Sequence, residues 1–157
     1  MSGAEAGEIV EMTRFHPLGR RPVDGGNADS KFLAVDVKDY LRQANEERFV
    51  IVQIEDPEGI ENMDDIAAVK GIDMLFFGPG DYSHALGIAG EFDHPEIDKA
   101  RKLVASAAEK NGKFAGTVGS ADNYKELVKM GYRFLNVGSD VGVMGKSLRE
   151  IADKLGG

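Results

Sequence analysis

The chain has 157 residues, the size of one domain, and its 42% hydrophobic and 29% charged content is typical of a soluble globular protein. A formal net charge of −8 argues against a nucleic-acid or anionic-membrane surface, because phosphates attract Lys and Arg. An anionic substrate stays compatible, since a bound cation reverses the local field. The absence of cysteine excludes disulfides and thiolate chemistry. With no long apolar run and no signal sequence at the start, a cytoplasmic protein is expected.

The first third of the chain predicts two helices joined by a loop. Residues 4–14 have apolar positions at helical spacing, and Pro17 ends that helix. Residues 19–30 are rich in Gly, Asp and Asn and predict a loop, whereas residues 35–45 predict an amphipathic helix. Residues 1–3 resemble a remnant of cloning.

From residue 49 onward, a strand–helix unit repeats. Apolar runs at 49–55, 74–77, 113–118 and 132–137 predict strands, with helices expected near 59–69, 95–110, 121–130 and 143–155. The run at 74–77 is followed by an expected loop before its helix. The runs are almost continuously apolar, so both faces of the sheet are expected to be covered and the strands to be parallel. Two architectures fit: an open doubly wound sheet, or half of a (β/α)₈ barrel, whose full length is about 250 residues.

Two of the predicted strands end on a carboxylate. Glu55 closes the first apolar run, and Asp81 follows the second. If the strands are parallel neighbours, both acids open onto the rim where α/β folds place their chemistry. Gln53 shares the face of Glu55, because side chains alternate along a strand. The pair suits a hard divalent cation or an acid/base couple; the alternative is that Glu55 caps a helix and Asp81 makes a turn.

The segment 78–81, Gly-Pro-Gly-Asp, is a second candidate. Its glycines let backbone approach a ligand, and the N–H groups of Gly80 and Asp81 are suited to an anion such as a carboxylate; the alternative is an ordinary turn. Arg21, with its neighbour Arg20, is a candidate carboxylate clamp or else a solvated loop residue. Of the three histidines only His84 lies near the predicted site, and a surface or helix-capping role is favoured for all three, with His94 expected at a helix start.

These motifs resemble a known family. The stretches 52–55 (Val-Gln-Ile-Glu) and 71–83 (Gly-Ile-Asp-Met-Leu-Phe-Phe-Gly-Pro-Gly-Asp-Tyr-Ser) are similar to the central motifs of the HpcH/HpaI-type metal-dependent (class II) pyruvate aldolases. Residues 15–21, 40–45, 94–96 and 134–140 support the resemblance, in family order. It implies an α/β fold that is the C-terminal half of a TIM barrel, with residues 1–157 as one partial-barrel domain.

The resemblance also implies a chemistry. Members cleave or form a carbon–carbon bond between a 2-oxo acid, pyruvate, and an aldehyde. Glu55 and Asp81 are expected to ligate a divalent metal, Mg²⁺ or else Mn²⁺ or Co²⁺, that stabilises the pyruvate enolate. Gln53 is expected to line the site, and the backbone at Gly80 and Asp81 to hold the carboxylate.

The chain departs from the family in one important respect. The His–Asp arrangement for proton transfer and an Arg on the pyruvate oxygens belong to the first half of the barrel and have no counterpart here. One hypothesis is therefore an aldolase chain completed by other strands, for example a homo-oligomer in which two copies close an eight-stranded ring. A second is a non-catalytic fragment that at most binds metal or 2-oxo acid. A third, more distant, is an unrelated four-stranded α/β binding module.

Overall fold

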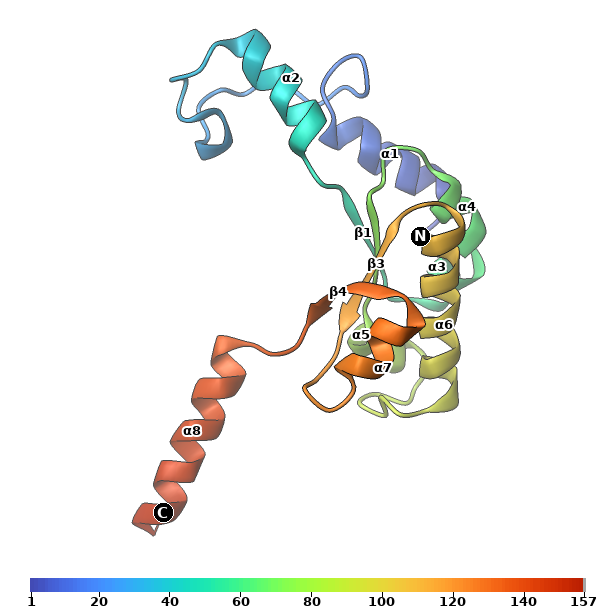
Figure 1. Ribbon diagram of the computed structural model, residues 1–157, viewed down its shortest axis with the longest axis vertical. Coiled ribbons are helices and arrows are strands. Elements are labelled where there is room, and N and C mark those ends of the chain that lie inside the picture. Colours follow the sequence, from blue (N-terminus) through green and yellow to red (C-terminus); the bar gives the residue numbers. More distant parts are fainter. Residues whose placement is uncertain (157) are drawn as a thin grey trace.

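A computed structural model describes residues 1–156 as a single parallel sheet with helices on one side (Figure 1). The four strands lie in the order β1-β2-β3-β4, each parallel to the next. They are β1 (Ile51–Ile54), β2 (Met74–Phe77), β3 (Phe114–Val118) and β4 (Tyr132–Asn136). Sequential order with all-parallel pairing is the arrangement of a barrel segment, so the predicted fold class is confirmed and a doubly wound order is not found.

Helices precede and connect the strands. Before the sheet come α1 (Gly3–Thr13), a short 3₁₀ turn (Ala28–Ser30) and α2 (Val37–Glu47). The connections contain α3 (Pro57–Glu61) and α4 (Met63–Ala68), then α5 (Pro79–Ala85) and α6 (Pro95–Lys110), then α7 (Tyr124–Met130). Helix α8 (Asp140–Leu155) follows the last strand. No helix among these described residues is long and apolar enough to cross a membrane.

Local chemistry explains most of the helix boundaries. Asp36 begins α2 by accepting hydrogen bonds from the N–H groups of Lys38 and Asp39. Gly131 ends α7 in the left-handed conformation with φ 116°, as its position after the helix predicts. The single helix expected near 59–69 is instead two short helices, because the chain leaves helical geometry at Asn62. Helix α7 starts at Tyr124, since Ser120 and Asn123 first form a hydrogen-bonded turn.

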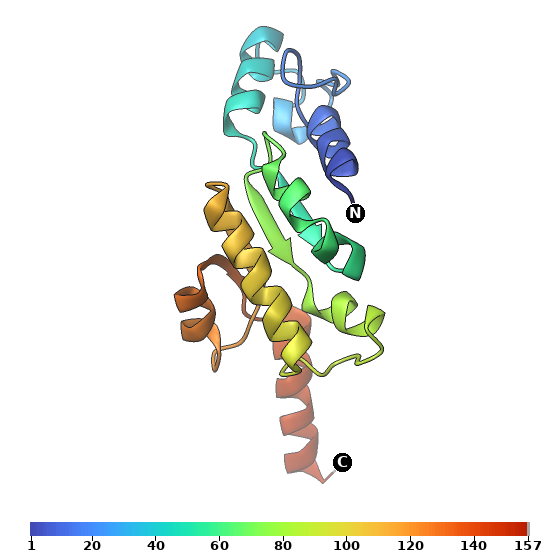
Figure 2. The same ribbon diagram turned by 90° about the vertical axis from the view of Figure 1, so that its right-hand side faces the viewer.

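The core lies between the sheet and one layer of helices. Val52, Ile54, Leu75 and Phe77 point to this side and are almost completely buried. Helices α4 and α6 lie over them, with α1 against α4, and Figure 2 shows α6 running across the sheet. The alternation of buried and exposed residues along β1 follows from this one-sided cover.

The opposite face of the sheet carries apolar side chains that stay exposed. Ile51, Phe114, Val118 and Phe134 are each 41% to 51% exposed. Phe134 stacks edge-on to Phe76, with ring centroids 6.2 Å apart. Within residues 1–156, β1 and β4 each have a neighbour on one side only. This is the face that turns inward when a parallel sheet closes into a barrel, so the expectation that both faces are covered is not met within this chain.

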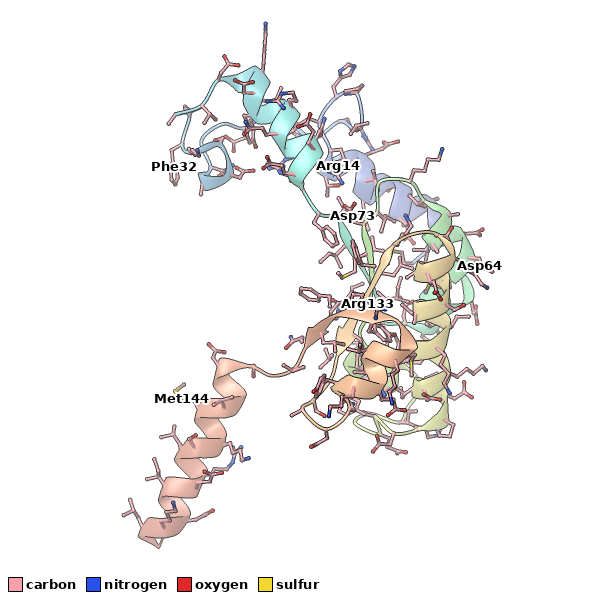
Figure 3. The ribbon with its side chains drawn as sticks, in the orientation of Figure 1. Arg14, Phe32, Asp64, Asp73, Arg133 and Met144 are labelled. Carbon is pink, nitrogen blue, oxygen red and sulfur yellow. The ribbon has the colours of Figure 1, made fainter. Side chains whose placement is uncertain are left out.

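A partly buried ion pair connects the N-terminal helix to the start of the sheet (Figure 3). Arg14, only 7% exposed, donates to Asp73 Oδ2 at 3.1 Å and to the carbonyl oxygen of Asn45 at 2.8 Å. Asp73 Oδ2 also accepts from the backbone N–H of Val50 at 2.7 Å. The pair therefore joins α1, the end of α2 and the entry to β2, at the edge of the sheet opposite the carboxyl ends of the strands.

Candidate functional site

Strand pairing brings Glu55 beside Gly78. Ile54, the last residue of β1, pairs with Phe77, the last residue of β2. The N–H of Gly78 donates to the carbonyl oxygen of Ile54 at 2.9 Å. Glu55 and Gly78 therefore leave the sheet next to each other at its carboxyl edge, as expected if the two strands are parallel neighbours.

The side chain of Glu55 is held against the backbone. The amide nitrogen of Gln53 donates a hydrogen bond to Glu55 Oε2, so these two side chains lie on the same side of β1 as predicted. A Cβ added at Gly78 would lie 3.0 Å from Glu55 Oε2 and 3.2 Å from Gln53 Nε2. Real Cβ atoms rarely approach so closely, so glycine at 78 makes room for the Glu55 carboxylate. The acid is half-buried, which leaves it accessible to a ligand at the rim.

Asp81 lies in the first turn of a helix, and the expectation of a loop at this position is wrong. Helix α5 begins with Pro79 after Gly78, because proline suits the first helical position, where no N–H partner is needed. Tyr82 anchors the helix by packing edge-on against Phe77, with centroids 5.3 Å apart. Asp81 itself is exposed at this N-terminus. The early N–H groups of a helix have no intrahelical partner, so those of Gly80 and Asp81 suit an anion.

The described residues offer this carboxylate pair and no larger ligand cluster. Within residues 1–156, no group of three or more His, Cys, Asp or Glu side chains is arranged to hold a metal ion. Two carboxylates are nevertheless a sufficient protein contribution for Mg²⁺, which keeps several waters and takes further oxygens from its substrate. The donor chemistry therefore fits a hard divalent cation.

A cavity of about 440 Å³ opens beside the start of α5, and the sequence analysis did not predict it. Pro79 and Gly80 form one wall, and Val118, at the end of β3, forms another. Arg101 reaches it from α6 and donates to the carbonyl oxygen of Phe92 at 3.2 Å, while its Nε is buried without a partner. The other lining residues are Asp93, Gly119, Ser120 and Asn123. No sequence signal marks Arg101, since α6 has the pattern of an ordinary amphipathic helix.

The structure does not bring Arg21 to this site. Its guanidinium donates to Asp29 Oδ2 at 3.2 Å and lies 5.0 Å from the ring centre of Phe15. It lines a cavity with Arg48 and Phe49, at the start of β1, whereas Glu55 follows the other end of that strand. The arginine is engaged with its own loop.

His94 and His84 have the helix-capping and surface positions that were favoured for them. His94 begins α6, and its Nδ1 accepts from the N–H of Glu96 at 3.2 Å. His84 is exposed in the last turn of α5, at the end of that helix away from Gly78. Burial raises the pKa of Tyr82 in the same helix, as expected for a side chain that packs against Phe77.

Known proteins resemble this chain in sequence and in fold. The sequence matches the HpcH/HpaI aldolase/citrate lyase family over residues 2–147. It is 35% identical over 150 residues to 5-keto-4-deoxy-D-glucarate aldolases of Shigella boydii and Klebsiella pneumoniae, covering 95% of this chain and 58% of each relative. The chain thus spans little more than half the length of these relatives.

Solved structures show the same relation. An HpcH/HpaI aldolase from Desulfitobacterium hafniense superposes with a TM-score of 0.88 at 29% identity, over 98% of this chain and 60% of that one. An HpcH/HpaI aldolase/citrate lyase family protein from Burkholderia cenocepacia gives 0.87 at 30% identity, over 99% and 62%. Four sequential parallel strands, an acid at the end of β1, a second at the start of α5 and a match along nearly the whole chain lead to one conclusion: the chain belongs to the HpcH/HpaI aldolase/citrate lyase family.

Proposed function

We propose that this chain carries the metal-binding half of a lyase site that cleaves or forms aldols of a 2-oxo acid, with pyruvate and an aldehyde as the small-molecule partners. The observation that supports it is the position of Glu55. Its carboxylate lies against Gly78 and is held by Gln53, at the edge of the sheet where α5 places Asp81. The relatives named as aldolases make carbon–carbon bond chemistry the first reaction to test.

Each residue has a separate task in this proposal. Glu55 and Asp81 hold a divalent cation, of which Mg²⁺ is the first choice and Mn²⁺ and Co²⁺ are alternatives. When bound, such an ion supplies Lewis acidity toward the negative charge that develops on the 2-oxo acid. Gln53 orients the Glu55 carboxylate by its hydrogen bond. The N–H groups of Gly80 and Asp81 bind the substrate carboxylate at the start of α5.

Proton transfer is not assigned to any residue of this chain. The family resemblance puts those residues on barrel strands that have no counterpart among the four strands here. His84 is not substituted for them, because it lies at the far end of α5 from Gly78.

A second candidate function is binding without turnover. It is favoured by the share of the relatives that the chain covers, 58%, and by the exposed inner face of the sheet. In this case the chain binds a divalent metal and a 2-oxo acid, and catalysis needs further strands.

Two measurements on the same protein test the proposal and separate the candidates. The first follows pyruvate release from a 4-hydroxy-2-oxo acid with Mg²⁺, Mn²⁺ or Co²⁺ and after EDTA treatment. The second is calorimetric titration with Mn²⁺. Glu55→Gln and Asp81→Asn are expected to abolish both signals, whereas Asp64→Asn, an exposed acid on α4, is the matched control and is expected to change neither.

The outcomes are distinct. Metal-dependent release that needs both acids supports the lyase. Metal binding that needs both acids, without release, supports the second candidate. Metal binding that survives both substitutions shows that Glu55 and Asp81 are not the ligands and overturns the site itself.

A further inference from the structure

The cavity at the start of α5 is not used by the proposed lyase site. Its volume, about 440 Å³, is typical of a small-molecule pocket. Gln53, Glu55 and Asp81 are not among the residues that line it. The lining comes from the first turn of α5, from residues 92–101 leading into α6, and from residues 118–123 after β3. All of these segments lie between β2 and β4 in the chain, so the walls do not depend on the open edges of the sheet.

Local hydrogen bonds hold two walls of the cavity in place. Before α6, the N–H of Phe92 donates to the carbonyl oxygen of Gly90 at 3.0 Å. After β3, the N–H of Ser120 donates to Asn123 Oδ1 at 2.8 Å, and the N–H of Asn123 donates to Ser120 Oγ at 3.3 Å. The cavity is therefore largely formed without a ligand, as small-molecule sites usually are.

Arg101 brings a positive charge without a counterion to this cavity. Its Nη1 donates to the carbonyl oxygen of Phe92 at 3.2 Å, whereas its Nε is buried and has no hydrogen-bond partner. Among residues 1–156, no carboxylate forms an ion pair with its guanidinium. A buried donor of a charged group is costly to leave unpaired, so an anion that accepts from Nε would stabilise this side chain.

Two more donors of the lining are unused. Ser120 Oγ accepts from the N–H groups of Asp122 and Asn123, so its own hydroxyl hydrogen is free to donate. Asn123 accepts through Oδ1, and its side-chain NH₂ group has no acceptor within the described part of the chain. The lining also contains Asp93, an exposed acid. Unused donors beside one guanidinium suit a ligand with a single negative charge, because Asp93 opposes a higher one.

Apolar side chains complete the cavity. Phe92 and Val118, which are 47% and 41% exposed, belong to its lining together with the buried Pro79. A ligand with an apolar body that covers these side chains removes their surface from water, which favours binding. A bare inorganic anion has no such body.

We propose that this cavity is a second ligand site, for a small organic carboxylate with an apolar body. The carboxylate accepts from Arg101 Nε, with Ser120 and Asn123 as further donors, and the body covers Phe92 and Val118. The site is independent of the proposed lyase chemistry, because neither acid of the proposed metal pair lines it.

The first test is a titration of the full chain with benzoate, followed by two-dimensional ¹H–¹⁵N NMR. Saturable shifts are expected at the amides of Arg101, Gly119 and Ser120, with a dissociation constant of about 1 mM. Benzamide has the same shape without the charge and is expected to bind at least about 10-fold more weakly. Inorganic phosphate, which lacks the apolar body, is also expected to bind more weakly than benzoate.

Three results of this titration would overturn the proposal. Equal affinity for benzamide would show that the cavity does not recognise an anion. Tighter binding of phosphate would show that it does not select an organic carboxylate. Benzoate-induced shifts confined to residues 53–55 and 78–81 would place the ligand at the lyase site and leave the cavity empty.

The second test changes the charges of the cavity. Arg101→Met keeps a long side chain without the guanidinium and is expected to raise the dissociation constant for benzoate at least about 10-fold. Lys99→Met removes an equal charge from an exposed position on the same helix and is the matched control, expected to leave the affinity unchanged.

Asp93→Asn alters an exposed residue, so it keeps the test valid if Arg101→Met fails to fold. It removes a charge of the same sign as the ligand and is expected to lower the dissociation constant about twofold at low salt. The spectrum of each unliganded variant checks its fold. Benzoate binding that survives Arg101→Met, or that Asp93→Asn does not strengthen, overturns the proposal.

Discussion

The substitution Gly78→Ala perturbs the candidate site with a single methyl group. At φ −98° alanine has no backbone strain, so the effect arises from contact alone. The new Cβ would lie 3.0 Å from both Glu55 Cβ and Oε2, which is at least 0.4 Å closer than ordinary van der Waals contact begins. The Glu55 side chain must move, and its hydrogen bond from Gln53 must change with it. Stability is expected to fall by about 1 kcal/mol, since alanine is also a poorer N-cap than glycine.

Metal affinity is expected to fall much more. Disturbing the groups that orient a metal ligand typically costs about 10- to 100-fold in affinity. Calorimetric titration with Mn²⁺ measures this, and urea unfolding measures stability in parallel. Gly80→Ala is the matched control, because a Cβ at Gly80 meets nothing within 4 Å. If both variants lose affinity equally, or if Gly78→Ala binds Mn²⁺ as the wild type does, the reasoning from the contact with Glu55 is refuted.

Two further predictions concern the fold. Arg14→Met leaves the partly buried Asp73 without its cation and is expected to lower the free energy of unfolding by about 2 to 3 kcal/mol in urea titrations. Arg20→Met removes only an exposed ion pair and is expected to lower the free energy of unfolding by less than about 1 kcal/mol. Equal losses in the two variants would contradict the role given to Arg14. Burial raises the pKa of the Tyr132 phenol, whose hydroxyl donates to the carbonyl oxygen of Arg101 at 2.9 Å. Its protonated form therefore contributes stability that is complete below the unfolded pKa of about 10 and is lost as the pH rises through the folded pKa. Tyr132→Phe is expected to cost about 1 kcal/mol at neutral pH and to make the alkaline loss of stability less steep; an unchanged alkaline slope would show that other groups govern it.

Local pattern was enough to predict most of the elements. Apolar runs of strand length bounded by glycine or polar residues predicted all four strands, because a strand that packs against helices on at least one face is rich in apolar residues. Prediction of secondary structure from the sequence was wrong in two places. At 78–81, Pro-Gly suits a turn as well as a helix start, and the packing of Tyr82 on Phe77 adds a tertiary contact that favours the helix. Near 59–69, helical periodicity gave no sign of the break at Asn62.

The sequence likewise predicted some residues of the candidate site but not the contacts between them. Glu55, Gln53 and Asp81 were predictable, since a strand end and side-chain alternation are local properties that parallel pairing turns into a common rim. The contact of Glu55 with Gly78 was not, because it depends on the spacing of two chains far apart in sequence. Arg21 was a reasonable carboxylate clamp by residue type, but the tertiary structure engages it with Asp29 near the start of β1.

The sequence by itself therefore determined the order of most strands and helices, the presence of an acid directly after the first strand and of another shortly after the second, and the family to which the chain belongs. These follow from hydrophobic periodicity and from motifs that are contiguous in the chain. Only the tertiary structure decided which groups meet. It placed Gly78 against Glu55, directed Arg14 to Asp73, and left α8 and one face of the sheet without cover. Those outcomes depend on packing between segments distant in sequence, where a difference of a few tenths of an ångström or the direction of one short connection decides the contact.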